Sequence, residues 1–465
     1  MTRVSGIDVM MLYAETPSWQ MHVSGLMIAD PSTAPDGFDA GVFRSGAAER
    51  LASLPPFRWK VREVALGLDH PVLVDEGDFD FDRHFHHVSL PGPGSPRQLG
   101  GLVGALMSKP LDRSLPLWEM WLIEGLQGGR VAVLTKIHHA LIDGASGVDL
   151  TSLLLDVEPS PSGHPLPSFP PPDPPPSAIS SALRATANLM ATPLRLGRYA
   201  TQVVEQGAVA GYHLLRGSNV GLPFRTGRSA LNGPITSARE FAYVDLPLSD
   251  VRAVRVAHRV KVNDVILAAV AGSLRAYLLE RGGLPSRPLV AEMPVNMRSE
   301  KNRMDIGTRV ANTFVSLATD IEDPVERLRA IHRSSIDAKQ VQHDVGARKH
   351  LDLSDVLPPL LTGAALRAYS RSGLESLVPP IYSLIVSNVR GPDFDLYLGG
   401  AKVVGIYPMG PLLYASGLNI TALTLGDRIH LGLVACPDRV PDPWSVAELL
   451  PKALDELAAD ASQPA

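Results

Sequence analysis

The sequence predicts a protein of the α/β class, with layers of helices and strands on both sides of a proline-rich linker. Short alternating apolar runs, typical of strands, recur in both halves of the chain among longer runs of helical spacing. Residues 159–177 hold ten prolines, which remove backbone donors and favour extended polyproline geometry. The length of 465 residues allows two or three domains, each with its own core.

The first domain is expected over residues 1–158. Its clearest elements are a helix at residues 98–108 (QLGGLVGALMS) and a strand at residues 130–137 (RVAVLTKI). The strand is apolar almost throughout, which is typical of a strand buried on both faces. These two elements predict that helices and strands are layered around one core in this domain.

The linker is expected over residues 159–235, with a proline-rich first part and a helical second part. The helical spacing extends over residues 177–217. Proline has no amide hydrogen and clashes with the preceding turn, so the helix is expected to break at Pro193.

The second domain is expected over residues 236–465 and contains the same mixture of elements. Alternating apolar runs predict strands, and runs of helical spacing predict helices, the last of them amphipathic. The expected strands cover residues 241–248, 288–298, 309–320 and 402–410, with a hairpin inside 412–435, and the expected helices cover residues 262–282, 323–340 and 442–460.

Composition excludes several classes of function. The chain has 43 basic and 48 acidic residues, a net charge of −5, without long charged runs, so no nucleic-acid partner is expected. A single cysteine, Cys436, excludes an internal disulfide framework and a multi-cysteine metal site, and fits a reducing cytoplasm.

The amino terminus lacks the pattern of an export leader. The longest apolar runs are shorter than the roughly 20 residues of a membrane-spanning helix, so any membrane contact is expected to be peripheral.

Two adjacent histidines, His138 and His139, stand where the strand at residues 130–137 gives way to a turn. Side chains alternate along a strand, so one imidazole is expected to act and the other to support it. Asp143 can brace the turn by hydrogen bonds or an ion pair, and Gly144 allows a left-handed backbone there. This arrangement suits a neutral imidazole that takes a proton from a hydroxyl group.

The alternative interpretation is that the two histidines only close the strand. A second pair, His86 and His87, has no Asp-Gly after it and is interpreted as solvated strand-edge residues. Other chemistries lack their motifs: there is no His-Glu-x-x-His zinc site, no Gly-x-Ser-x-Gly nucleophile and no glycine-rich phosphate loop. Neither a metal nor a cofactor is therefore expected.

The motif His-His-x-x-x-Asp-Gly at residues 138–144 resembles the signature of the bacterial wax ester synthase/diacylglycerol acyltransferases, members of the CoA-dependent acyltransferase superfamily. Peptide-synthetase condensation domains share the motif, but further segments narrow the resemblance and follow the family's order across nearly the whole chain. They are MHVSGLMI (21–28), PLDRSLPLWEMWLIEGL (110–126), LNGPI (231–235), VNDVILA (262–268), SNVRGP (387–392) and GLNIT (417–421). One departure is Arg390, where the family more often has proline.

The resemblance implies two chloramphenicol-acetyltransferase-like domains with a tunnel between them. It also implies transfer of a fatty acyl group from acyl-CoA, as a substrate, to diacylglycerol or a long-chain alcohol. His139 would be the general base, which is worth roughly 10²- to 10⁴-fold in rate. Diacylglycerol is the expected acceptor, by analogy with relatives that make triacylglycerol.

The resemblance also suggests supporting roles for other residues. Asn263, next to Asp264, is either an oxyanion donor at a helix start or an N-cap. Arg298 is expected to form an ion pair with Asp143, although a solvated Arg298 is the alternative. Two further groups are expected to pack or to shape the tunnel, and they are Pro116, Leu117 and Trp118, and Ser387, Asn388, Gly391 and Pro392.

Three alternatives to a diacylglycerol acyltransferase remain from the sequence. They are a wax ester synthase, a condensation-type enzyme that acts on carrier-bound thioesters, and an acyl-lipid binding protein without turnover. The apolar substrates imply a cytoplasmic protein in peripheral contact with a membrane or lipid droplet through exposed apolar patches.

Overall fold

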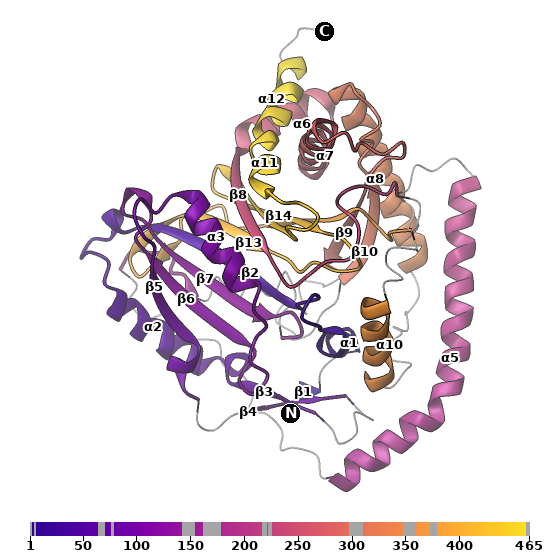
Figure 1. Cartoon of the computed structure of the whole chain (residues 1–465), viewed down its shortest axis with the longest axis horizontal. Coiled ribbons are helices and arrows are strands. Elements are labelled where there is room, and N and C mark those ends of the chain that lie inside the picture. Colours follow the sequence, from indigo (N-terminus) through magenta and orange to yellow (C-terminus); the bar gives the residue numbers. More distant parts are fainter. Residues whose placement is uncertain are drawn as a thin grey trace.

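Two six-stranded sheets form the body of the protein, each covered by helices (Figure 1). The structure is a computed structural model, and the residues that it describes are 2–3, 6–63, 70–75, 79–141, 154–160, 178–215, 221, 226–296, 310–346, 359–372 and 379–461.

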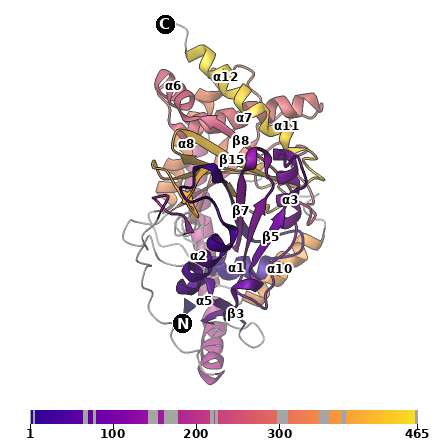
Figure 2. The ribbon, with the colours of Figure 1, turned by 90° about the vertical axis from the view of Figure 1, so that its left-hand side faces the viewer.

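The first sheet has the strand order β12-β13-β2-β7-β6-β5. Its strands are β2 (His22–Asp30), β5 (Phe85–Ser89), β6 (Trp118–Glu124), β7 (Val131–His138), β12 (Tyr397–Leu398) and β13 (Ala401–Met409). Every residue of β7 is buried, as the apolar run predicts. Helices α2 (Ala40–Ser53) and α3 (Pro96–Met107) pack against opposite faces of this sheet (Figure 2).

The second sheet has the strand order β10-β9-β11-β14-β15-β8. Its strands are β8 (Glu240–Pro247), β9 (Val290–Asn296), β10 (Val310–Ser316), β11 (Leu384–Arg390), β14 (Leu418–Leu425) and β15 (Arg428–Ala435). Five helices surround its core: α6 (Leu248–His258), α7 (Val262–Glu280), α8 (Pro324–Gly346), α11 (Pro443–Ala447) and α12 (Leu449–Ala461). Within the described part of the chain, α7 alone is long and apolar enough to cross a membrane, but 72% of its apolar window is buried in this core.

The two halves of the chain exchange strands. β13 follows β11 in sequence, yet it pairs with β2 of the first sheet and also contacts β14 and β15 of the second. A Cβ atom at Gly432 of β15 would lie 2.3 Å from the Pro408 carbonyl oxygen, so only glycine permits this crossing. The predicted domain boundaries at residues 158 and 235 place β12 and β13 in the second domain. In the structure, these two strands complete the amino-terminal sheet.

A second connection joins the amino-terminal helix to the second half of the chain. Helix α1 (Gly6–Ala14) packs against α10 (Pro359–Ser372), and Arg367 of α10 donates to the Tyr13 carbonyl oxygen at 2.5 Å. Close to them lies a small sheet of β1 (Thr2–Arg3), β4 (Val72–Asp75) and β3 (Trp59–Arg62), in that order (Figure 1).

The helix expected after the linker does not break at Pro193. Helix α5 (Ala178–Leu215) continues through this proline and is bent in Figure 1, where it lies along the flank of the molecule. A proline removes one hydrogen bond and kinks a helix without always ending it. The final helix, in contrast, is divided into α11 and α12 at Glu448. Residues 161–177 of the expected proline-rich linker lie outside the described residues.

Candidate active site

The backbone of the histidine pair is held by two neighbouring strands. His138 is the last residue of β7 and lies opposite His22 of β2 in the antiparallel register. Its amide donates to the Leu117 carbonyl oxygen at 2.9 Å, and the amide of His139 donates to the Met21 carbonyl oxygen at 2.7 Å. The turn therefore begins from a position fixed on both sides.

The side chain of His138 is buried and neutral. Its Nδ1 accepts a hydrogen bond from the Ala140 amide at 3.1 Å, which puts the ring proton on Nε2. Burial, followed by the nearby charges of Arg113 and His139, lowers the pKa of His138 to about 3. His138 is thus a fixed neutral ring at every ordinary pH and cannot serve as a base that exchanges protons with solvent.

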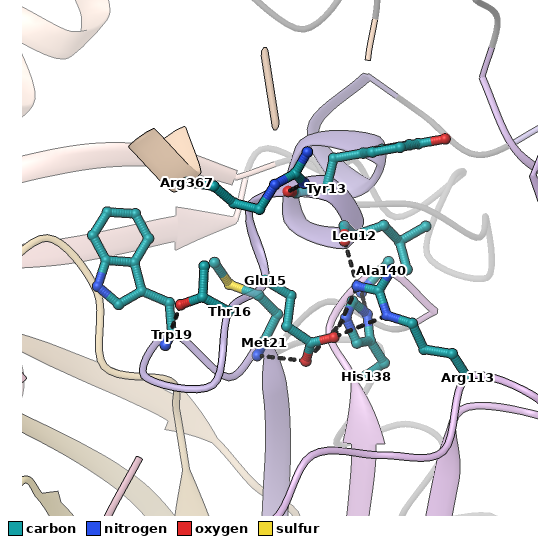
Figure 3. Close-up of polar contacts among 10 residues, drawn as sticks. All are labelled: Leu12, Tyr13, Glu15, Thr16, Trp19, Met21, Arg113, His138, Ala140 and Arg367. Atoms are coloured by element: carbon teal, nitrogen blue, oxygen red, sulfur yellow. Dashed lines mark hydrogen bonds and ion pairs between the residues drawn. The ribbon is translucent and has the colours of Figure 1, made fainter. Parts of the chain in front are cut away.

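A carboxylate connects His138 to an arginine, as Figure 3 shows. Glu15 lies just after α1, and its Oε1 is 3.8 Å from Nε2 of His138. Its Oε2 binds Arg113 at 2.8 Å from Nη2 and 3.2 Å from Nε. The Met21 amide donates to Oε1 at 3.3 Å, and Arg113 also donates to the Leu12 carbonyl oxygen.

Sequence reasoning missed this network. Arg113 lies inside the segment PLDRSLPLW that carries the family resemblance, but no role was assigned to it, and Glu15 was not singled out. The signal that could have identified Arg113 is its charge within this largely apolar segment. Nothing in the spacing links Glu15 to Arg113, which is 98 residues away.

His139 differs from His138 in its accessibility. His139 is half-buried, whereas the side chain of His138 has an exposed fraction of 1%. Of the two imidazoles, that of His139 is therefore the one that a substrate can reach, which fits the predicted division into an acting and a supporting histidine. Asp143, Gly144 and Arg298 lie outside the described residues, so the ion pair between Asp143 and Arg298 stays a prediction.

A second neutral imidazole lies beside the pair. His22 is fully buried, and its burial, followed by the charges of Lys136 and His138, holds its pKa well below its usual range. Lys136 is buried too and donates to the carbonyl oxygens of Leu106 (3.2 Å) and Lys109 (2.5 Å), at the carboxyl end of α3. A cation is favourable there because a helix end presents unpaired carbonyl groups.

Asn263 and Asp264 of the VND segment have different surroundings. The N-cap of α7 is Lys261, and its amide donates to the Asp264 carboxylate at 2.9 Å, while His332 Nδ1 binds the same oxygen at 2.7 Å. Asn263 lies within the first turn, not before it, and its Oδ1 accepts from Asn388 Nδ2 at 3.4 Å. Capping is thus carried out by Asp264, and Asn263 meets Asn388, another residue singled out from the sequence.

The PLW residues pack next to the histidine pair. Pro116, Leu117 and Trp118 are all buried, and the Leu117 carbonyl holds the His138 amide. The Trp118 indole donates to the Phe57 carbonyl oxygen at 2.8 Å and stacks on His84 with ring centroids 4.4 Å apart. These contacts are those of a core residue.

The segment SNVRGP ends β11. Ser387, Asn388, Gly391 and Pro392 are all half-buried. A Cβ atom at Gly391 would lie 2.3 Å from the Thr424 carbonyl oxygen of β14, which explains a glycine where the chain leaves β11. Within the ranges that the structure describes, no cluster of three histidine, cysteine or acidic side chains is arranged to hold a metal ion.

Comparison with solved structures defines the class of protein. The first condensation domain of the calcium-dependent antibiotic synthetase has the same fold, with a TM-score of 0.59 at 16% identity over 100% of this chain and 97% of that one. A wax ester synthase/diacylglycerol acyltransferase from Marinobacter aquaeolei VT8 matches with a TM-score of 0.69 at 27% identity, over 99% of this chain and 100% of that one. The two-domain fold with a histidine pair at a strand end is therefore that of this acyltransferase class.

Sequence comparison gives the family. The model of the wax ester synthase/diacylglycerol acyltransferase catalytic domain matches residues 4–266, and the model of the WS/DGAT C-terminal domain matches residues 306–458. A Mycobacterium tuberculosis H37Rv protein described as a diacylglycerol O-acyltransferase is 37% identical, over 98% of this chain and 90% of its own length. A second protein of that strain with the same description is 34% identical, over 97% of both chains. This chain belongs to the wax ester synthase/diacylglycerol acyltransferase family and is an acyltransferase.

Proposed function

We propose that this enzyme transfers a fatty acyl group from acyl-CoA to diacylglycerol and so forms triacylglycerol. The observation that carries the choice of acceptor is the 37% identity, over 98% of the chain, to a relative described as a diacylglycerol O-acyltransferase. Acyl-CoA is a substrate, and the proposal requires no cofactor or metal. The enzyme acts on the cytoplasmic side of a membrane or lipid droplet, where its apolar acceptor is found.

The accessible histidine supplies the proton chemistry of the proposal. His139 takes the hydroxyl proton of diacylglycerol as that oxygen forms a bond to the thioester carbonyl carbon. The tetrahedral oxyanion then collapses, the carbon–sulfur bond breaks, and the imidazolium returns the proton to the departing CoA thiolate. Each proton taken is given back, so no covalent acyl-enzyme is needed.

The buried neighbour supports this step through its lack of charge. His138 stays neutral because its pKa is lowered to about 3, chiefly by burial. An imidazolium that forms at His139 during turnover therefore meets no positive charge on the adjacent ring, which would otherwise oppose proton uptake. Asn263 remains the proposed amide donor to the oxyanion: its Oδ1 accepts from Asn388, and its Nδ2 makes only a weak contact with Met293 Sδ at 3.9 Å.

The decisive experiment supplies purified protein with labelled hexadecanoyl-CoA and either dioleoylglycerol or hexadecanol. Labelled triacylglycerol in excess of wax ester, lost in a His139→Ala variant, is the expected result. A larger yield of wax ester would make the long-chain alcohol the acceptor. No ester with either acceptor would overturn the proposal. In a parallel reaction with a carrier-bound hexadecanoyl thioester, product from this donor alone would indicate a condensation-type enzyme.

A further inference from the structure

Helix α5 carries an unusual share of the exposed apolar side chains. Twelve large hydrophobic residues are exposed in the described part of the chain, and six of them lie on this helix. They are Met190 (80% exposed), Leu194 (62%), Leu196 (39%), Val203 (48%), Val204 (72%) and Tyr212 (50%). Scattered single residues of this kind are normal on a protein surface, but such a concentration on one element marks an interaction site.

The exposed residues form a continuous stripe along one side of the helix, which we name the α5 stripe. At spacings of three and four residues, its members are all exposed and none is charged: Leu194, Gly197, Thr201, Val204, Ala208 and Tyr212. With a rise of 1.5 Å per residue, the stripe is about 27 Å long. Met190 extends it one turn further toward the amino end of the helix.

The other side of α5 faces the protein. Its half-buried residues follow the same spacing and include polar side chains: Thr192, Arg195, Tyr199, Gln202, Gln206, Val209 and His213. His213 Nε2 binds Asp344 Oδ2 of α8 at 2.9 Å, and α5 packs against α8. The helix is therefore held to the body of the protein by its polar side, and the exposed apolar side chains lie on its other side.

Two properties of this surface decide what kind of partner it fits. Leu196 and Val203 widen the stripe on one flank, so apolar residues occupy about half of the helix circumference, more than the narrow seam of a coiled coil. The helix contains three arginines and one glutamate, and Arg195 lies on its half-buried side. Two exposed charged residues lie beside the stripe on its other flank: Arg198, one position after Gly197, and Glu205, one position after Val204.

We propose that the α5 stripe is the surface by which this enzyme docks on a lipid surface. A helix with a broad apolar face lies in the plane of a membrane, with the apolar side chains among the acyl chains and the charged groups at its edge near the head groups. The inference rests on the proposed function, because diacylglycerol is dissolved in lipid and the enzyme must reach it there. It adds to that function the particular segment that makes the contact.

The experiment compares wild type with a Leu194→Glu, Val204→Glu double variant. Flotation with vesicles of phosphatidylcholine, phosphatidylglycerol and dioleoylglycerol measures the bound fraction. The vesicle dissociation constant of the variant is expected to rise about tenfold or more, because two apolar side chains that enter the lipid become carboxylates. A matched control is Val256→Glu on α6, which is 69% exposed but lies outside the stripe and should bind like wild type.

Activity completes the test. Turnover of vesicle-bound dioleoylglycerol should fall in the double variant, while turnover of a water-soluble short-chain alcohol stays at the wild-type rate. Equal melting temperatures would show that the variants fold.

The outcomes separate this inference from the proposed function. Unchanged vesicle binding in the double variant overturns the docking surface. If light scattering then shows that the variant has lost a dimer, the α5 stripe binds a second copy of the chain instead. Wild-type protein that binds vesicles through the α5 stripe but makes no triacylglycerol leaves the docking surface standing and overturns the proposed function.

Discussion

One oxygen of the Glu15 carboxylate lies 3.8 Å from Nε2 of His138, while the other binds the Arg113 guanidinium at 2.8 Å. The carboxylate is thus shared between a buried neutral ring and a cation whose side chain is 45% exposed. It joins the end of α1 to the end of β7, and α1 in turn packs on α10 from the other half of the chain. We therefore predict that Glu15 positions the segment that carries the histidine pair.

Replacement of Glu15 tests this role. Glu15→Gln keeps the shape of the side chain but removes the charge, so we expect kcat to fall about tenfold with little change in KM, as for an interaction that positions a catalytic group. The loss of stability should be small, about 1 kcal/mol, because Arg113 is half exposed to water. Urea unfolding and initial rates measure the two effects, and Glu124→Gln, at an exposed pair with His87, is the control. A variant with wild-type kcat would rule out the positioning role.

The two histidines should respond differently to truncation. His139→Ala is expected to lower kcat by roughly 10²- to 10⁴-fold and leave the fold intact, because the half-buried ring is the proposed base. His138→Ala removes a fully buried ring and should lower the free energy of unfolding by roughly 2–4 kcal/mol. Rates of CoA release and urea unfolding of both variants distinguish the roles. Equal activity of His139→Ala and wild type would contradict the assignment.

Burial of His138 predicts an acid-sensitive fold. The pKa of this group is about 3 in the folded protein and near 6.5 in the unfolded chain, so below pH 6.5 the unfolded state binds a proton that the folded state does not. Stability is complete above this pH and is lost as the pH falls toward 3, by about 1.4 kcal/mol per pH unit. His22, whose pKa is also lowered by burial, acts in the same direction.

Urea unfolding between about pH 7 and 5 measures this slope. His138→Asn should reduce the slope by about one proton, whereas His87→Gln, at an exposed strand-edge position, should leave it unchanged. An unaltered slope in His138→Asn would mean that the acid sensitivity has another source.

Glu292 of β9 predicts a pH dependence of opposite sign. It is buried, and burial raises the pKa of its carboxyl to about 7, although a hydrogen bond from Tyr382 lowers it in part. Between its usual pKa and 7, the folded state binds the extra proton, so this contribution to stability is lost as the pH rises. Glu292→Gln should therefore be more stable than wild type by up to about 3 kcal/mol near pH 8 and nearly equal to it near pH 5. Thermal unfolding at both pH values tests this, and equal stability at the higher pH would count against it.

Much of the fold follows from the sequence because hydrophobic periodicity is local. The expected elements at residues 98–108, 130–137, 241–248 and 262–282 correspond to α3, β7, β8 and α7. The family and the acyltransferase class were also predicted correctly from the motif and the segments around it. The hydrophobic periodicity and the motif are both properties of short stretches of the chain.

The features that were not predicted depend on contacts between distant segments. An alternating run at residues 402–410 predicts a strand but not its partner, so the pairing of β13 with β2 was not anticipated. The contacts of Glu15 with Arg113 and His138 join three segments that no periodicity connects. Pro193 is a local signal, but whether α5 ends or continues at this proline depends on the whole helix.

The crossing of β13 into the first sheet also affects the order in which this protein can fold. β2 has β7 on one side and β13 on the other, so until residue 409 has been synthesised one edge of β2 has unpaired backbone groups. Such an edge invites pairing with strands of other chains. The first sheet is thus expected to stay incomplete during synthesis until β13 is available to pair with β2. A fragment that ends in the linker lacks β13 and is expected to aggregate. The two six-stranded sheets are therefore expected to fold as one cooperative unit.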